Sequence, residues 1–211
     1  MVSEDGLHHY LTQVAEMMKK ARKPLEGYRY RSQEEFLLAE GTFYSAEPLT
    51  AVEEQTLLRV LRLTSGPFKT KECYYNAFRL VSAGKILGGV DLRYAEGIAN
   101  GSILPVTHSW VVLNGKPIDV TWGENLVAAG HNRVRSPTRM LERIKYNLAN
   151  ASYCGFTVPC EVVMRRCVET GMTPNFLDDW ENGYPLLKEG LPKEWMAQSL
   201  IVQAGHSETP T

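Results

Sequence analysis

Three segments carry most of the information on the architecture of this chain: KECYYNAFRLV at residues 71–81, LRYAEGIANG at 92–101 and PVTHSWVVLNGKPIDVTW at 105–122. The first segment places Cys73 at the start of an apolar pattern with helical spacing. The other two contain the β-branched and aromatic residues that favour strands. Together they predict an α+β fold, in which a helix that begins at the cysteine packs on an antiparallel sheet.

The dipeptide Asn114-Gly115 is a strong signal for a two-residue β-hairpin turn. If these are the two turn residues, residue 113 faces residue 116, and His108 lies opposite Thr121 on the neighbouring strand. Asp119 then lies diagonal to His108 on the same face of the sheet, at roughly 7–8 Å between backbones. This register therefore predicts a hydrogen bond between His108 and Asp119.

The order cysteine, histidine, aspartate suits a thiol nucleophile, a base that takes its proton and an acid that orients the base. Helix-start N–H groups and the helix dipole favour a thiolate, and the N–H of Cys73 is the first candidate for an oxyanion donor. Taken singly, Cys73 suits a small buried apolar residue, His108 a hydrogen-bonded core histidine, and Asp119 a turn or surface residue. Because order, register and helix-start placement agree, we predict a Cys73–His108–Asp119 catalytic triad.

Several short motifs resemble the transglutaminase-like branch of the papain-like cysteine superfamily, and in particular uncharacterised bacterial and phage proteins of that type. The resemblance covers residues 70–160 and rests on separated motifs that occur in the expected order. These motifs are Lys71-Glu-Cys-x-x-Asn-Ala77, Tyr94-x-Glu-Gly97, His108-Ser-Trp110, Asp119-Val-Thr-Trp122 and Tyr153-x-Gly155.

The resemblance implies a papain/transglutaminase-like core with Cys73 as nucleophile, His108 as base and Asp119 as orienting acid. It also assigns Trp110 and Trp122 to the support of the site. Two positions depart from the family pattern, since Ser109 replaces the usual alanine and Val120 the usual proline, and both changes leave the reacting atoms in place. No upstream glutamine or tryptophan aligns as an oxyanion donor.

Three further polar residues, two within these motifs and one upstream of them, are candidates for a role in the site. Asn76 either braces the turn that carries the cysteine or caps local backbone. Glu96 is expected to be a charged residue on a half-exposed strand rather than a substrate-binding group. Gln55, upstream of the cysteine, is expected to face solvent on a helix rather than to serve an oxyanion hole.

The rest of the chain predicts one α+β domain over residues 1–205. Its parts are a helical N-terminal part (1–66), a catalytic core (67–160) and a helical C-terminal part (161–205), before a disordered tail (206–211). Apolar spacing and capping signals predict helices at 6–23, 32–41, 50–63, from 73 to slightly past 84, 136–150 and 159–171, with short helical pieces at 176–180 and 193–201. Strands are expected at 91–99, 106–113, 117–122 and 153–159, and a loop at 123–135.

Composition excludes several classes of protein. The chain has 211 residues, 44% of them hydrophobic and 22% charged, with a formal net charge of −1. No basic stripe suits a nucleic-acid backbone, and neither an export signal nor a membrane-spanning run is present. A cytoplasmic protein with four free thiols is therefore expected.

No metal or other cofactor is expected. The cysteine spacings, 73, 154, 160 and 167, do not form the paired pattern of a zinc site. Cys160 and Cys167 lie seven positions apart on one helix face, which favours apolar packing. The adjacent His8 and His9 do not face one another on a helix and suit an exposed helix end.

The favoured function is acyl transfer from an amide or thioester, either as an amide hydrolase, protease or deamidase or as a transglutaminase. The substrate would be a protein, a peptide or a small amide. One alternative is a binding or inhibitor protein that keeps the fold without turnover. Another is arylamine N-acetyltransferase chemistry, which uses the same order of residues and predicts acetylation of Cys73 by acetyl-CoA.

Overall fold

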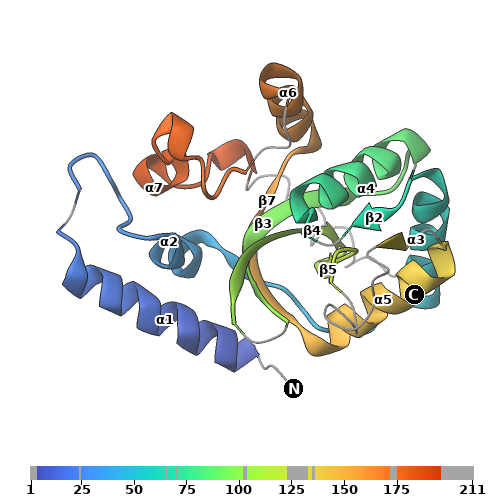
Figure 1. Ribbon diagram of the computed structural model, residues 1–211, viewed down its shortest axis with the longest axis horizontal. Helices are drawn as coiled ribbons and strands as arrows, with labels where there is room; N and C mark the ends of the chain where they lie inside the picture. The colour runs from blue at the N-terminus through green and yellow to red at the C-terminus, as the bar shows by residue number, and fades with distance from the viewer. Residues whose placement is uncertain are drawn as a thin grey trace, which may run out of the picture.

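The computed structural model describes residues 4–195, apart from 24, 65, 70, 102–103, 123–132, 135 and 172–174, and gives the backbone alone for 133–134. Most of residues 123–135 and the segments 196–201 and 206–211 therefore lie outside the described residues, and so do the expectations made for them. The described elements form a mixed α+β structure in which helices surround a curled antiparallel sheet (Figure 1).

Helices were the most predictable elements. All six longer predicted helices are present, and the structure adds a 3-10 helix, η1 (Trp180–Asn182), and a short helix that the sequence analysis did not predict. The helices are α1 (Glu4–Ala21), α2 (Gln33–Glu40), α3 (Ala51–Leu63), α4 (Cys73–Leu87), α5 (Pro137–Asn150), α6 (Cys160–Thr170) and the added α7 (Pro185–Glu189).

Local capping explains where these helices start. The Ser32 hydroxyl accepts the N–H of Glu35, and Ser136 accepts the N–H of the third residue of α5. Thr50 and Glu53 form a complete capping box at the start of α3, as their spacing predicts. Gly84 lies near the end of α4, as predicted, and the helix ends at Leu87.

The main sheet has the order β1-β7-β3-β4-β5, and every neighbouring pair is antiparallel. A second sheet pairs the two-residue strands β2 (Phe68–Lys69) and β6 (Arg133–Val134). The strands of the main sheet are β1 (Thr42–Phe43), β7 (Ser152–Val158), β3 (Leu92–Asn100), β4 (Val106–Leu113) and β5 (Lys116–Ile118). The predicted helical N-terminal part therefore also supplies an edge strand, β1, which no local pattern announced.

The hairpin between β4 and β5 has the predicted register. Residue 113 pairs with 116, and Val111 pairs with Ile118. Both turn residues have positive φ, 50° at Asn114 and 79° at Gly115, as a two-residue turn of this type requires. The prediction that β5 runs to Trp122 is wrong, because the strand ends at Ile118.

The two faces of the main sheet differ in the size of their side chains. One face carries large residues such as Tyr94, Val111 and Phe156, which join the apolar side chains of the surrounding helices in the main core. The other face has small residues on β3, including Ala95, and a cluster of aromatic rings that contains Trp110 and Tyr153. His108 and Asp119 belong to this second face.

A pair of glycines lets β3 and β7 approach each other closely. Gly97 pairs with Gly155, and a Cβ on Gly97 would lie 2.1 Å from the carbonyl oxygen of Cys154. A Cβ on Gly155 would lie 2.2 Å from the carbonyl oxygen of Glu96 and 2.7 Å from the ring of Trp110. Since neither contact is possible, both positions require glycine, and the aromatic ring covers the gap.

Glu96 is fully buried, so the expectation of a half-exposed strand residue is wrong. Its Oε2 accepts the N–H groups of Phe176 at 2.7 Å and Leu177 at 2.9 Å, and its Oε1 accepts the Tyr94 hydroxyl at 2.9 Å. The carboxyl group therefore anchors the C-terminal segment to the centre of the sheet. This segment forms a turn at 176–178 before η1 rather than the predicted helical piece.

The described residues contain no helix that combines the length and the apolar character needed to cross a bilayer.

Candidate active site

Cys73 is the first residue of α4, which packs against β3 and β4. The chain reaches it through a tight turn in which Lys71 has a φ of 65°, a conformation that is uncommon for a residue other than glycine. Glu72, at the N-cap, makes no side-chain capping bond, and its carboxylate pairs instead with Lys69 Nζ at 2.9 Å. The first N–H groups of the helix therefore lack the side-chain cap that usually accepts from them.

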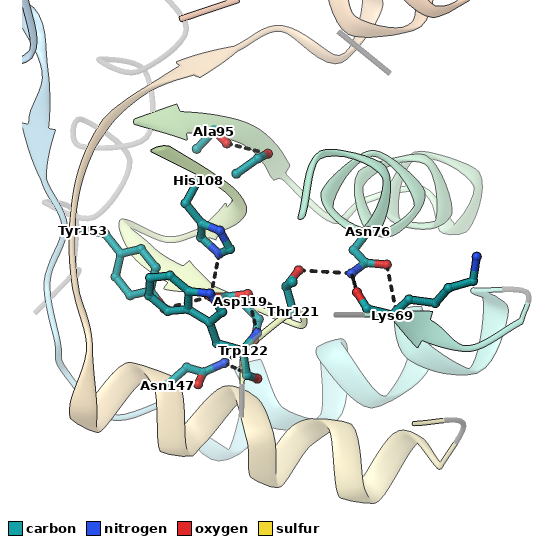
Figure 2. A network of polar contacts seen from close by, with 10 residues as sticks. Lys69, Asn76, Ala95, His108, Asp119, Thr121, Trp122, Asn147 and Tyr153 are labelled. Atoms are coloured by element: carbon teal, nitrogen blue, oxygen red, sulfur yellow. Dashed lines mark hydrogen bonds and ion pairs between the residues drawn. The ribbon is translucent and has the colours of Figure 1, made fainter. Parts of the chain in front are cut away.

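Cys73 is partly exposed, whereas the side chain of His108 is buried. Cys73 lies close enough to His108 to raise the pKa of the imidazole. The imidazole Nε2 lies 2.9 Å from Asp119 Oδ2 (Figure 2). Because Nε2 faces the carboxylate, Nδ1 is the ring nitrogen that remains for a second partner. The structure thus brings together the three predicted residues, with the imidazole bonded to Asp119 and within the electrostatic influence of Cys73.

The turn after β5 explains why the strand ends where it does. Asp119 Oδ1 accepts the backbone N–H groups of Thr121 at 2.7 Å and Trp122 at 3.4 Å. These local bonds replace the ladder bonds that a longer strand would make, and they turn the carboxylate back toward His108. Because the strand ends early, Thr121 does not pair with His108 in the sheet. The predicted hydrogen bond between His108 and Asp119 is nevertheless present.

Burial and charge set the protonation of this couple. Burial lowers the pKa of His108, but the charge and hydrogen bond of Asp119, followed by the influence of Cys73, raise it overall from 6.5 to about 9. Burial raises the pKa of Asp119, but the charge and hydrogen bond of His108, with the bonds from Thr121 and Tyr153, hold it below its usual value. At neutral pH the couple is therefore an imidazolium–carboxylate ion pair.

Aromatic rings surround the imidazole. The ring of Trp122 stacks on His108 with a centroid distance of 4.3 Å and an interplanar angle of 17°. Trp110 is also stacked with it, at 6.3 Å and 20°. Gly101 allows this arrangement, because a Cβ there would lie 2.5 Å from the Trp122 ring. The indole faces shield the imidazole from water and favour its cationic form.

Asn76, on α4, braces the site rather than caps its own helix. Its amide nitrogen donates to the carbonyl of Lys69 at 2.6 Å and to the Thr121 hydroxyl at 3.1 Å, and its oxygen accepts the N–H of Lys69 at 3.3 Å (Figure 2). The side chain thus ties the cysteine helix both to β2 and to the Asp119 turn. Since its amide hydrogens have these acceptors, Asn76 supports the site and is a poor candidate for an oxyanion donor.

Two residues that the sequence analysis gave no role complete the site. Asn147, on α5, donates to the carbonyl oxygens of Asp119 and Trp122, both at 2.9 Å, and so clamps the two ends of the turn. Tyr153, on β7, places its hydroxyl 3.1 Å from Asp119 Oδ2. The Tyr153-x-Gly155 motif marked this stretch, but only the pairing of β3 with β7 shows that Tyr153 faces the aspartate.

The remaining candidate residues lie apart from the site. Gln55 is exposed on α3, as expected. All four cysteines are free, and burial raises the pKa of both Cys160 and Cys167. Cys160 and Cys167 pack at the margin of the main core, as predicted. His8 and His9 are both exposed on α1, also as predicted.

Among the residues that the structure describes, no three histidine, cysteine, aspartate or glutamate side chains gather as a metal site would need.

The comparisons with known proteins add no assignment to this geometry. No protein-family model, no curated protein and no solved structure matches the chain.

Proposed function

We propose that this protein is an acyl-transfer enzyme in which Cys73 is the nucleophile, His108 the general acid and base, and Asp119 the orienting acid. We further propose that its core is of the papain/transglutaminase type. The observation that carries the proposal is the buried imidazole, which bonds to Asp119 Oδ2 at 2.9 Å and whose pKa is also raised by Cys73, a cysteine at a helix start.

The proposed reaction begins when the Cys73 thiolate attacks the carbonyl carbon of an amide. A C–S bond forms, and the carbonyl oxygen becomes an oxyanion that accepts the N–H of Cys73. The C–N bond then breaks as protonated His108 gives its proton to the departing amine. Water or a primary amine attacks the thioester, loses a proton to His108 and displaces the thiolate, which restores the starting state.

The polar network around Asp119 supports this assignment over a binding protein that lacks turnover. A buried ion pair usually costs more in lost hydration than it returns in stability. Here three further side chains, Asn76, Asn147 and Tyr153, hold the Asp119 turn in place. Such reinforcement is expected where a histidine must be kept charged and oriented.

We expect iodoacetamide at neutral pH to alkylate Cys73 at least about tenfold faster than the other three thiols, because the thiolate is the reactive form and His108 stabilises it. Peptide mapping by mass spectrometry over time measures the four rates. Cys160 and Cys167 are internal controls, since they are also partly exposed.

His108→Ala should slow labelling of Cys73, whereas His9→Ala, at an exposed position on α1, should not. Equal, slow labelling of all four cysteines would contradict the proposal and favour a binding protein. If acetyl-CoA alone adds an acetyl group to Cys73, visible in the intact mass, the acetyltransferase alternative is favoured.

The pKa of His108 predicts how the rate depends on pH for two kinds of leaving group. A p-nitroanilide needs a proton on its departing amine, so its turnover should fall about tenfold per pH unit above pH 9, where His108 loses its proton. A p-nitrophenyl ester with the same acyl group has a leaving group that departs as an anion. The first release of nitrophenolate should therefore persist above pH 9.

Stopped-flow absorbance on both substrates between pH 6 and pH 10.5 measures these two profiles. A common alkaline decline for the anilide and the ester would show that His108 is not the acid that protonates the leaving group.

A further inference from the structure

Tyr153 lies on β7 on the same face of the sheet as His108, and its side chain is 2% exposed. Its ring packs against Trp110 at a centroid distance of 5.1 Å and against Trp122 at 6.2 Å. Gly155, two residues along the strand, leaves room for the Trp110 ring. The tyrosine is therefore fixed within the aromatic cluster, with its hydroxyl directed at Asp119.

Asp119 Oδ2 accepts from two donors at once, His108 Nε2 at 2.9 Å and the Tyr153 hydroxyl at 3.1 Å. Oδ1 accepts from the backbone of the turn. The aspartate side chain is 0% exposed, so water does not supply these bonds. A carboxylate has about four acceptor directions, and here protein donors fill both of those on Oδ2.

The direction of the Tyr153 bond is fixed by chemistry. Burial, followed by the charge of Asp119 and its hydrogen bond, raises the pKa of Tyr153 well above 10. The hydroxyl therefore remains a donor over the working range of any such enzyme and does not relay protons. Its effect on the dyad acts through Asp119 alone.

We propose that Tyr153 is a positioning residue, whose hydroxyl keeps Asp119 ionised and holds the orientation in which Oδ2 meets His108 Nε2. Its effect on turnover rests on the proposed function, whereas its effect on the Asp119 carboxyl group does not. Without the hydroxyl, a buried carboxylate oxygen keeps its charge but loses one of its two donors. That loss favours the protonated carboxyl group and allows it to rotate away from the imidazole.

Tyr153→Phe is expected to raise the titration midpoint of Asp119 by about one pH unit, since one hydrogen bond to a charged group is removed. The carboxyl carbon resonance of ¹³C-aspartate-labelled protein, followed downward from pH 7 to the pH of unfolding, measures this midpoint. The rate of Cys73 alkylation should fall about tenfold in the same variant. With an anilide substrate, kcat should fall while KM stays unchanged, because the buried tyrosine does not reach the substrate.

Tyr44→Phe is the matched control, because Tyr44 belongs to the same aromatic cluster and packs on Trp110 at 5.6 Å. It should change neither the midpoint nor the alkylation rate. The inference is overturned if Asp119 titrates at the same pH in the wild type and in Tyr153→Phe. It is also overturned if neither protein shows a titration of Asp119 above the pH at which it unfolds. If Tyr153→Phe shifts the midpoint while His108→Ala leaves Cys73 alkylation unchanged, the positioning contact stands and the proposed function fails.

A second variant tests the same contact if Tyr153→Phe does not fold. Replacement of Tyr153 by 2,3-difluorotyrosine keeps the shape of the ring and makes the hydroxyl a stronger donor. The Asp119 midpoint should then move downward, opposite to Tyr153→Phe. An unchanged or higher midpoint in the fluorinated protein would overturn the inference.

Discussion

His108→Gln is expected to lower the turnover of an anilide substrate by about 1,000-fold, because proton transfer by a positioned side chain contributes on that order. Glutamine keeps a polar side chain of similar reach next to Asp119, so the loss reports the missing acid and base. The glutamine side chain cannot give a proton to the leaving amine or take one from water. Steady-state release of p-nitroaniline, with the fraction of folded protein checked by circular dichroism, measures the effect.

His9→Gln is the matched control, since it makes the same change at an exposed position on α1 and should leave turnover unchanged. Cys73→Ser should abolish the covalent acyl-enzyme seen by intact mass. A His108→Gln protein with more than about a tenth of wild-type turnover would contradict the role of His108 as acid and base.

Glu96→Ala is expected to lower the free energy of unfolding by about 4 kcal/mol, because it leaves two buried N–H groups without an acceptor and opens a cavity. Those N–H groups belong to Phe176 and Leu177, so the C-terminal segment should detach first. Urea unfolding measures the loss, and hydrogen exchange of residues 176–189 shows where it occurs. Glu142→Ala, on the solvent side of α5, should change stability by less than about 0.5 kcal/mol.

The same residue predicts a pH dependence of stability. Burial raises the pKa of Glu96 to about 8, although its three hydrogen bonds act in the opposite direction. Because the pKa in the folded state is above that in the unfolded state, Glu96 contributes stability below pH 4.5. That contribution is lost as the pH rises through 8.

Glu96→Gln keeps an acceptor for the two N–H groups but cannot ionise. Between pH 5 and pH 9 the free energy of unfolding should therefore fall by a few kcal/mol less in Glu96→Gln than in the wild type. Parallel pH profiles for wild type and Glu96→Gln would show that Glu96 is ionised throughout.

The parts of this protein that depend on neighbours in sequence were predictable. The Thr50–Glu53 capping box starts α3, and Asn114-Gly115 sets the register of the hairpin. That register was enough to predict the His108–Asp119 couple, because the two strands are joined by the turn itself. In each case the residues that interact lie within a few positions or across one tight turn.

The wrong prediction for Glu96 and the missed strand β1 both concern contacts between residues that are far apart in the sequence. Glu96 lies on a strand where alternation alone suggested one exposed face, but residues about 80 positions later cover it. The strand β1 joins the sheet only because β7, more than 100 residues away, provides an edge for it. The extent of β5 was overestimated for a local reason, because the Asp119 side chain competes with the ladder for the N–H of Thr121.

Local sequence patterns predict the helix that begins at Cys73, the hairpin next to His108 and Asp119, and the order of these three residues along the chain. The groups that reinforce them become visible only in the folded protein, where Asn76 on α4, Asn147 on α5 and Tyr153 on β7 all reach one turn. Hydrogen bonds and packing within a helix or a hairpin follow from local geometry, whereas the burial and charge of the dyad depend on elements that meet only when the chain is folded.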